Sequence, residues 1–179
     1  MDGIRINRAV AAAAALALVA GGARAEVSGV SPSGFVVTQH AEVAAAPAQV
    51  FAAIGHPERW WNGEHTYSGD AANLSLALSA GGCFCERWGD NSVEHARVLY
   101  VGRDRALRLS GGFGPLQALA VDAILTMTLT AHDGRTSVQW VYRVSGNADA
   151  ALDKLAGPVD HVLGDQLTRL AKAAAASAP

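Results

Sequence analysis

The sequence predicts an α+β fold in which a curved antiparallel sheet of about seven strands wraps around one long C-terminal helix. Apolar and polar residues alternate in a series of short segments through the middle of the 179-residue chain. Two short helical segments follow the first of these strands, and apolar residues recur at helical spacing near the C-terminus. A chain of this length is expected to form one domain with one apolar core.

The chain begins with the features of a secretory signal peptide. Arg5 and Arg8 precede an unbroken apolar run over residues 9–20, and Ala23-Arg24-Ala25 supplies the small residues of a cleavage site. The apolar run is too short to span a bilayer as a helix. We therefore predict a signal peptide over residues 1–25 that is cleaved after Ala25. A membrane anchor or an alanine-rich tail is the alternative interpretation.

Removal of this segment defines the expected mature protein, which would be exported, with the periplasm as its expected location. Residues 26–34 are rich in serine and glycine and are predicted to be a linker before a domain over residues 35–176. The mature chain would hold 11 basic and 15 acidic residues, with no cluster of Lys or Arg. This composition argues against nucleic acid as a partner, and no membrane span is expected in the mature chain.

The first elements are predicted from periodicity and from two prolines. Alternation over residues 35–44 predicts the first strand. Pro47 suits the first turn of a helix that ends near Ile54, and Pro57 begins a second short helix through Trp60 and Trp61. The later strands are predicted by alternation between turn residues, over residues 74–79, 83–88, 93–101, 106–110, 123–131 and 137–144.

The last element is predicted to be one long amphipathic helix from Asp149 to Ala175. Gly157-Pro158 should kink this helix, because proline lacks a backbone N–H. One helix cannot fill the concave face of a curved sheet, so a pocket is expected between helix and sheet. The glycine-rich segment over residues 111–115 is interpreted as a flexible lip at the mouth of that pocket.

Cys83 and Cys85 are two residues apart in one predicted strand, so both side chains should lie on the same face. Parallel Cβ vectors give poor disulfide geometry, and we therefore interpret the cysteines as buried small apolar residues. A strained redox pair and an intermolecular bridge are the alternatives. A single Cys-x-Cys pair is weak evidence for a metal site, and neither a metal nor a cofactor is predicted.

The order of elements and several local motifs resemble the START/birch-pollen-allergen-like (SRPBCC) superfamily. Residues 46–54, with Pro57-Glu58 and Trp60-Trp61, resemble its strand–helix–helix opening, and Gly81-Gly82-x-Phe84 with Glu86 resembles its next strand. The branch most similar to this chain contains the C-terminal domain of the heat-shock ATPase activator and polyketide-cyclase-like bacterial proteins. The resemblance covers roughly residues 35–175 and implies a helix-grip fold, with a cavity between the sheet and the long helix.

The superfamily includes carriers, hormone binders, cyclases and co-chaperones, so the fold alone does not decide the activity. Ligand-binding candidates are the large apolar and aromatic residues expected near the cavity, although core packing would give the same pattern. These candidates are Trp60, Trp61, Trp88, Phe113, Leu125, Met127, Trp140 and Tyr142.

Glu86 and His95 are the catalytic candidates, because an inward ionisable group could act as an acid or a base. Strand parity places Glu86 on the same face as Trp88, and His95 on the same face as Arg97. For each of Glu86, His95, Arg97 and Arg143, the solvent-exposed convex face is the favoured position, because burying an unpaired charge is costly.

Three functions remain open at this point. The favoured hypothesis is an exported binding or carrier protein for a small hydrophobic molecule, and it requires that Trp88, Trp140 and Met127 do not fill the cavity. A cyclase- or lyase-like enzyme would need Glu86 or His95 in the cavity. An interaction module with a filled core is the third hypothesis. The sequence leaves the ligand and the oligomeric state open.

Overall fold

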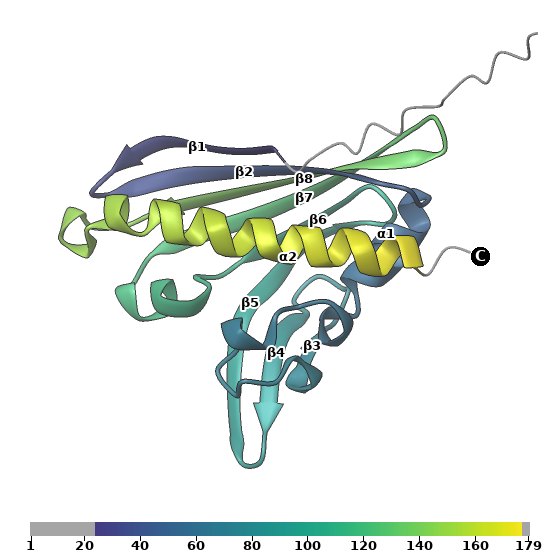
Figure 1. Ribbon diagram of the computed structural model, residues 1–179. Helices are drawn as coiled ribbons and strands as arrows, with labels where there is room; N and C mark the ends of the chain where they lie inside the picture. The colour runs from purple at the N-terminus through teal and green to yellow at the C-terminus, as the bar shows by residue number, and fades with distance from the viewer. Residues whose placement is uncertain (1–23, 177–179) are drawn as a thin grey trace, which may run out of the picture.

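In the computed structural model, which describes residues 24–176, one open antiparallel sheet of eight strands packs against a long C-terminal helix (Figure 1). The strands follow the order β1-β2-β8-β7-β6-β5-β4-β3 across the sheet. Their bounds are β1 Arg24–Ser31, β2 Gly34–Val43, β3 Leu74–Leu76, β4 Cys83–Trp88, β5 Asn91–Gly102, β6 Ala106–Ser110, β7 Asp122–His132 and β8 Arg135–Ser145.

The helices lie where their start signals predict, with one exception described below. α1 spans Pro47–Ile54 and α2 spans Ala156–Ala176, and short 3-10 turns connect the other elements. These turns are η1 Pro57–Arg59, η2 Gly63–His65, η3 Ala71–Asn73, η4 Gly114–Leu119, η5 Ala148–Ala150 and η6 Leu152–Lys154. The predicted α+β class, the antiparallel sheet and the long C-terminal helix are therefore confirmed.

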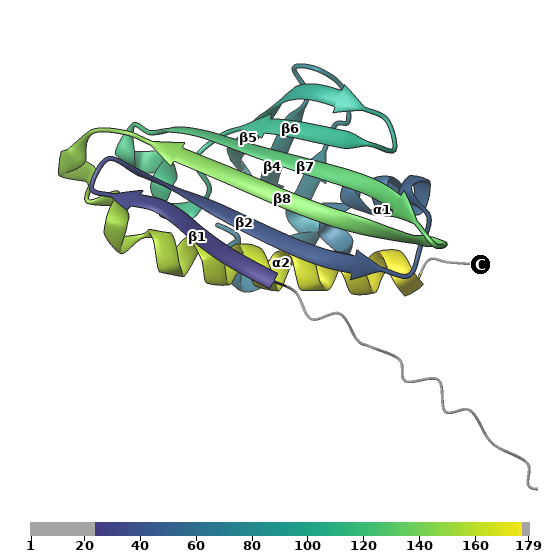
Figure 2. The same ribbon diagram turned by 90° about the horizontal axis from the view of Figure 1, so that it is seen from above.

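The eighth strand is β1, and it corrects the linker prediction for residues 26–34. Glu26 pairs with Thr38 and Val27 with Val37, so most of this segment forms an edge strand beside β2 (Figure 2). Its residues from 25 to 30 are exposed, which removes the apolar alternation that reveals other strands. Gly29 has a φ of +59° where the register shifts, so it marks a bulge in a strand. Residues 1–23 of the predicted signal peptide lie outside the described residues.

The predicted kink in the C-terminal helix is wrong, because the helix begins later than expected. Residues 148–154 form η5 and η6, and Ala151 between them has the left-handed φ of 49°. Pro158 is consequently the third residue of α2, within the first turn. The first-turn N–H groups have no partner inside a helix, so a proline there removes no hydrogen bond.

The core lies between α2 and the concave face of the sheet. Leu163, Leu167, Leu170 and Ala174 recur at helical spacing and are buried in this layer. Every second residue of β7 and β8 faces the same core, as the alternation predicts. The buried members of these two strands are Ala123, Leu125, Met127, Leu129, Thr136, Val138, Trp140, Tyr142 and Val144.

Cys83 and Cys85 form a disulfide, so the interpretation of two unpaired cysteines is wrong. That interpretation assumed a regular strand, in which residues two apart are separated by about 6.6 Å. Here the register between β4 and β5 shifts between Phe84 and Cys85, and the cysteine Cα atoms lie 5.3 Å apart. This shorter separation is close to the usual Cα spacing of a disulfide.

Within residues 24–176, no helix combines the length and the apolar character needed to cross a membrane.

Candidate functional site

A pocket of about 500 Å³ opens between the N-terminal half of α2, the segment after η1 and the segment that contains η4. This pocket lies at one end of the space between sheet and helix, where a cavity was expected. The lining residues are Trp61, Glu64, His65, Thr66, Tyr67, Phe113, Gly114, Pro115, Ala118, Tyr142, Leu155, Pro158, Val159, Val162 and Leu163.

The walls of this pocket are mostly apolar and differ in character. Val159, Val162 and Leu163 recur at three- and four-residue spacing, so α2 presents one aliphatic stripe to the pocket, and Leu155 extends it just before the helix begins. Aromatic rings form much of the opposite wall, where Phe113 lies 6.1 Å from Trp61 and 5.3 Å from Tyr142 between ring centroids. Such a pocket suits a compact apolar molecule.

The hydroxyl of Tyr142 fixes one side of the pocket. It donates to the carbonyl oxygen of Gly111 at 2.9 Å and accepts the Phe113 N–H at 3.1 Å. Burial raises the pKa of Tyr142, although the Phe113 hydrogen bond opposes that effect. The hydroxyl therefore stays protonated and ties the glycine-rich segment to β8.

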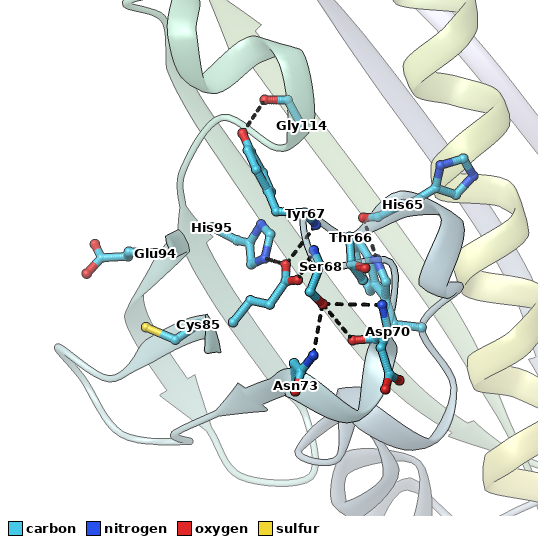
Figure 3. Close-up of polar contacts among 12 residues, drawn as sticks. His65, Thr66, Tyr67, Ser68, Asp70, Asn73, Cys85, Glu94, His95 and Gly114 are labelled. Atoms are coloured by element: carbon cyan, nitrogen blue, oxygen red, sulfur yellow. Dashed lines mark hydrogen bonds and ion pairs between the residues drawn. The ribbon is translucent and has the colours of Figure 1, made fainter. Parts of the chain in front are cut away.

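The opposite side of the pocket is held by a buried Glu86–His95 pair (Figure 3). Both side chains face inward, which corrects the favoured convex-face position, whereas Arg97 and Arg143 are exposed as expected. The parity argument for His95 and Arg97 fails because β5 contains a bulge at this point. Ala96 pairs with Phe84 and Glu94 with Cys85, which leaves His95 as the additional residue. His95 and Ala96 are consequently both buried.

The Glu86 carboxylate accepts hydrogen bonds on both of its oxygens. Tyr67 N–H donates to Oε2 at 3.0 Å, Ser68 N–H donates to Oε1 at 2.6 Å, and His95 Nε2 lies 2.9 Å from Oε2. Burial alone would raise the pKa of Glu86, but the hydrogen bonds from Ser68, Tyr67 and His95 outweigh burial and lower the pKa below 4.5. The carboxylate is therefore ionised and fully engaged in holding the chain at residues 67–68.

Burial, the largest cause, lowers the pKa of His95 below 6.5, although the Glu86 carboxylate acts in the opposite direction. At neutral pH the ring is therefore uncharged and donates from Nε2 to Glu86. Neither His95 nor Glu86 lines the pocket, because Tyr67 and its neighbours lie between them and the cavity. The geometry makes them positioning residues for the pocket wall.

Tyr67 connects the two sides of the pocket. Its backbone N–H is held by Glu86, and its hydroxyl lies 3.3 Å from the Gly114 carbonyl oxygen (Figure 3). The same hydroxyl donates to Gln117 Oε1 at 3.0 Å. Gln117 in turn donates from Nε2 to the carbonyl oxygen of Glu94 at 2.6 Å. The Glu86–His95 pair thus supports a bridge across the pocket wall.

This pair should make stability depend on pH in a defined direction. The folded state lowers the pKa of His95, so the unfolded chain takes up protons first, and stability is lost as pH falls below 6.5. The lowered pKa of Glu86 adds a second loss as pH falls below 4.5. Urea unfolding at pH 8, 6 and 5 should show the first loss in the wild type and a smaller one in His95→Gln. Equal losses in both proteins would contradict this account.

The sequence-predicted ligand residues fall into three groups. Trp61, Phe113 and Tyr142 line the pocket. Trp60, Leu125, Met127 and Trp140 are buried in the core and are not part of the lining. Trp88 is partly exposed at the end of β4, away from the described pocket.

Several lining residues were not among the candidates. The aliphatic residues of α2 could have been found from the helical stripe that predicted the helix itself. Tyr67 carried no such signal, because it lies in an irregular segment between η2 and η3 and is 51% exposed.

No protein-family model matches this chain, and no curated protein matches it. Solved structures do resemble it. The protein MLL2253 from Mesorhizobium loti has a TM-score of 0.59 at 15% identity and covers 80% of this chain and 99% of its own. A Rhodobacter sphaeroides protein has a TM-score of 0.58 at 14% identity, covering 86% of this chain and 99% of its own.

CalU16 from Micromonospora echinospora has a TM-score of 0.51 at 12% identity and covers 87% of this chain and 94% of its own. Identities this low show a common fold. They do not allow the role of a residue in one protein to be assigned to a residue in the other. The chain therefore has a helix-grip fold, in which an open antiparallel sheet holds a long C-terminal helix.

Proposed function

We propose that this protein binds or carries a small hydrophobic molecule in the pocket beside the N-terminal half of α2. The observation that carries the proposal is the pocket itself, which has a volume of about 500 Å³, an aliphatic wall from α2 and an aromatic wall opposite. Removing apolar surface from water favours binding by about 25 cal/mol per Å² of buried area. Trp140 and Met127 fill the core elsewhere without closing this pocket.

Binding is better supported than catalysis by the positions of the ionisable groups. A catalytic carboxylate or imidazole must reach the reacting atoms. Glu86 accepts hydrogen bonds on both oxygens and lies behind Tyr67, so its contacts serve the pocket wall. The shared helix-grip fold and the resemblance to the SRPBCC superfamily support membership of that superfamily, which we include in the proposal.

We further propose that the mature protein is exported. The basic and apolar N-terminal pattern and the cleavage pattern at residues 23–25 support this, and disulfides such as Cys83–Cys85 persist mainly in oxidising compartments. In a bacterial host, N-terminal sequencing of the periplasmic fraction should yield a chain that begins at Glu26. Recovery of the chain in the cytoplasm with Met1 intact would contradict export.

The binding proposal is tested by filling the pocket from α2. Val162 lines the pocket, so Val162→Trp should occupy its volume and weaken binding of N-phenyl-1-naphthylamine at least tenfold, as read from the fluorescence of this apolar probe. His161 is the neighbouring exposed position outside the lining, so His161→Trp is the matched control and should leave the affinity unchanged. Equal affinities in both variants would refute the proposed site.

A further inference from the structure

The Cys83–Cys85 disulfide lies in β4 directly opposite the bulge that carries His95. Residues 83–85 of β4 pair with residues 94–97 of β5, so three residues face four. The cysteine Cα atoms are 5.3 Å apart, whereas two residues of a regular strand are separated by about 6.6 Å. A shortened strand leaves its neighbour with surplus chain, and a bulge takes up that surplus. The disulfide and the bulge at His95 therefore belong to one local geometry.

Phe84, the residue enclosed between the two cysteines, supports the aromatic wall of the pocket. It is buried, and its ring centroid lies 5.2 Å from that of Trp61 and 6.0 Å from that of Phe113. Both of these rings line the pocket. The Phe84 ring also lies 5.2 Å from the His95 ring. A change in the backbone between the cysteines therefore reaches the pocket lining through direct ring contacts.

Glu86 follows Cys85 directly and provides a second connection to the pocket. Its Oε2 lies 2.9 Å from His95 Nε2 and accepts the backbone N–H of Tyr67 at 3.0 Å. Tyr67 lines the pocket. Without the bulge, strand parity would turn His95 to the other face of the sheet, and Glu86 would lose this donor. The local geometry at the disulfide thus supports two parts of the pocket wall.

We propose that oxidation of Cys83 and Cys85 completes this wall, so that the protein binds its apolar ligand tightly only in the disulfide form. The inference rests on the proposed binding function and adds a redox requirement at the same pocket. When the bond is open, β4 is free to adopt the regular strand spacing. The bulge then loses its cause, and Phe84 and His95 loosen together. The chain reaches its full affinity in an oxidising compartment.

The oxidation requires a partner disulfide as the electron acceptor. Cys83 is partly exposed, whereas Cys85 is buried, so Cys83 is the accessible thiol. Its thiolate attacks one sulfur of the partner disulfide and releases the other sulfur as a thiolate. The Cys85 thiolate then attacks Cys83 Sγ and releases the second partner sulfur. The two cysteines lose two electrons and two protons in total, and the partner disulfide becomes two thiols.

The first test measures the dissociation constant of N-phenyl-1-naphthylamine for the oxidised protein and for protein reduced with tris(2-carboxyethyl)phosphine. Thiol labelling of a sample of each confirms its redox state. Reduction should raise the dissociation constant about tenfold. The double variant Cys83→Ala with Cys85→Ala should bind like the reduced wild type and should not respond to the phosphine. Equal constants for the oxidised and reduced wild type would overturn the inference and leave the proposed function standing.

Hydrogen exchange distinguishes a loosened pocket wall from general unfolding. The N–H groups of Tyr67 and Ser68 donate to Glu86, so they should exchange about tenfold faster after reduction. The ladder between β7 and β8 should keep its protection in both redox states. Loss of protection in that ladder as well would overturn the inference, because the disulfide would then stabilise the whole fold. Failure of the oxidised wild type to bind the probe would overturn the proposed function and this inference together.

Discussion

Glu86→Ala is expected to lower the free energy of unfolding by about 3 kcal/mol, because buried groups that bind the carboxylate lose their acceptor. The Tyr67 and Ser68 N–H groups and His95 Nε2 all depend on it. The change should also free the segment that contains Tyr67 and weaken probe binding. Urea unfolding followed by tryptophan fluorescence measures the first effect, and probe titration measures the second.

Glu94→Ala is the matched control for this prediction. Glu94 pairs with Arg97, but both side chains are largely exposed, and exposed ion pairs contribute at most about 1 kcal/mol. Its removal should change stability little. If Glu86→Ala were no more destabilising than Glu94→Ala, the positioning role of the Glu86–His95 pair would be wrong.

Trp140→Ala should destabilise the protein by about 3–5 kcal/mol, because it leaves a cavity beneath α2. Trp140 is fully buried and lies outside the pocket lining, so its role here is core packing. Trp88→Ala makes the same replacement at a partly exposed position and should cost about 1 kcal/mol or less. Thermal and urea unfolding of the two variants compare these costs, and similar losses would contradict the assignment of Trp140 to the core.

Most of the sheet could be predicted because burial on one face imposes a period of two on the sequence. Residues 83–88 and 106–110 were bounded correctly, since Gly-rich turns flank them. β1 could not be predicted in the same way. It is exposed along residues 25–30, so its sequence is free to be polar and resembles a linker.

The site was less predictable than the fold, because it depends on local departures from regular geometry. The bulge at His95 reverses the parity of β5 and brings His95 against Glu86, and a period of two cannot reveal it. The aromatic residues were recognised, but their division between pocket and core depends on how α2 crosses the sheet. Tyr67 depends on three-dimensional contacts with Gln117 and Glu86 that the sequence does not display.

The most direct test of the central claim is native mass spectrometry of the protein as isolated from cells and after incubation with N-phenyl-1-naphthylamine. The account predicts a one-to-one complex with a small apolar molecule in the wild type and in His161→Trp, and its loss in Val162→Trp. A bare polypeptide mass for the wild type under both conditions, or an equal complex in Val162→Trp, would contradict it.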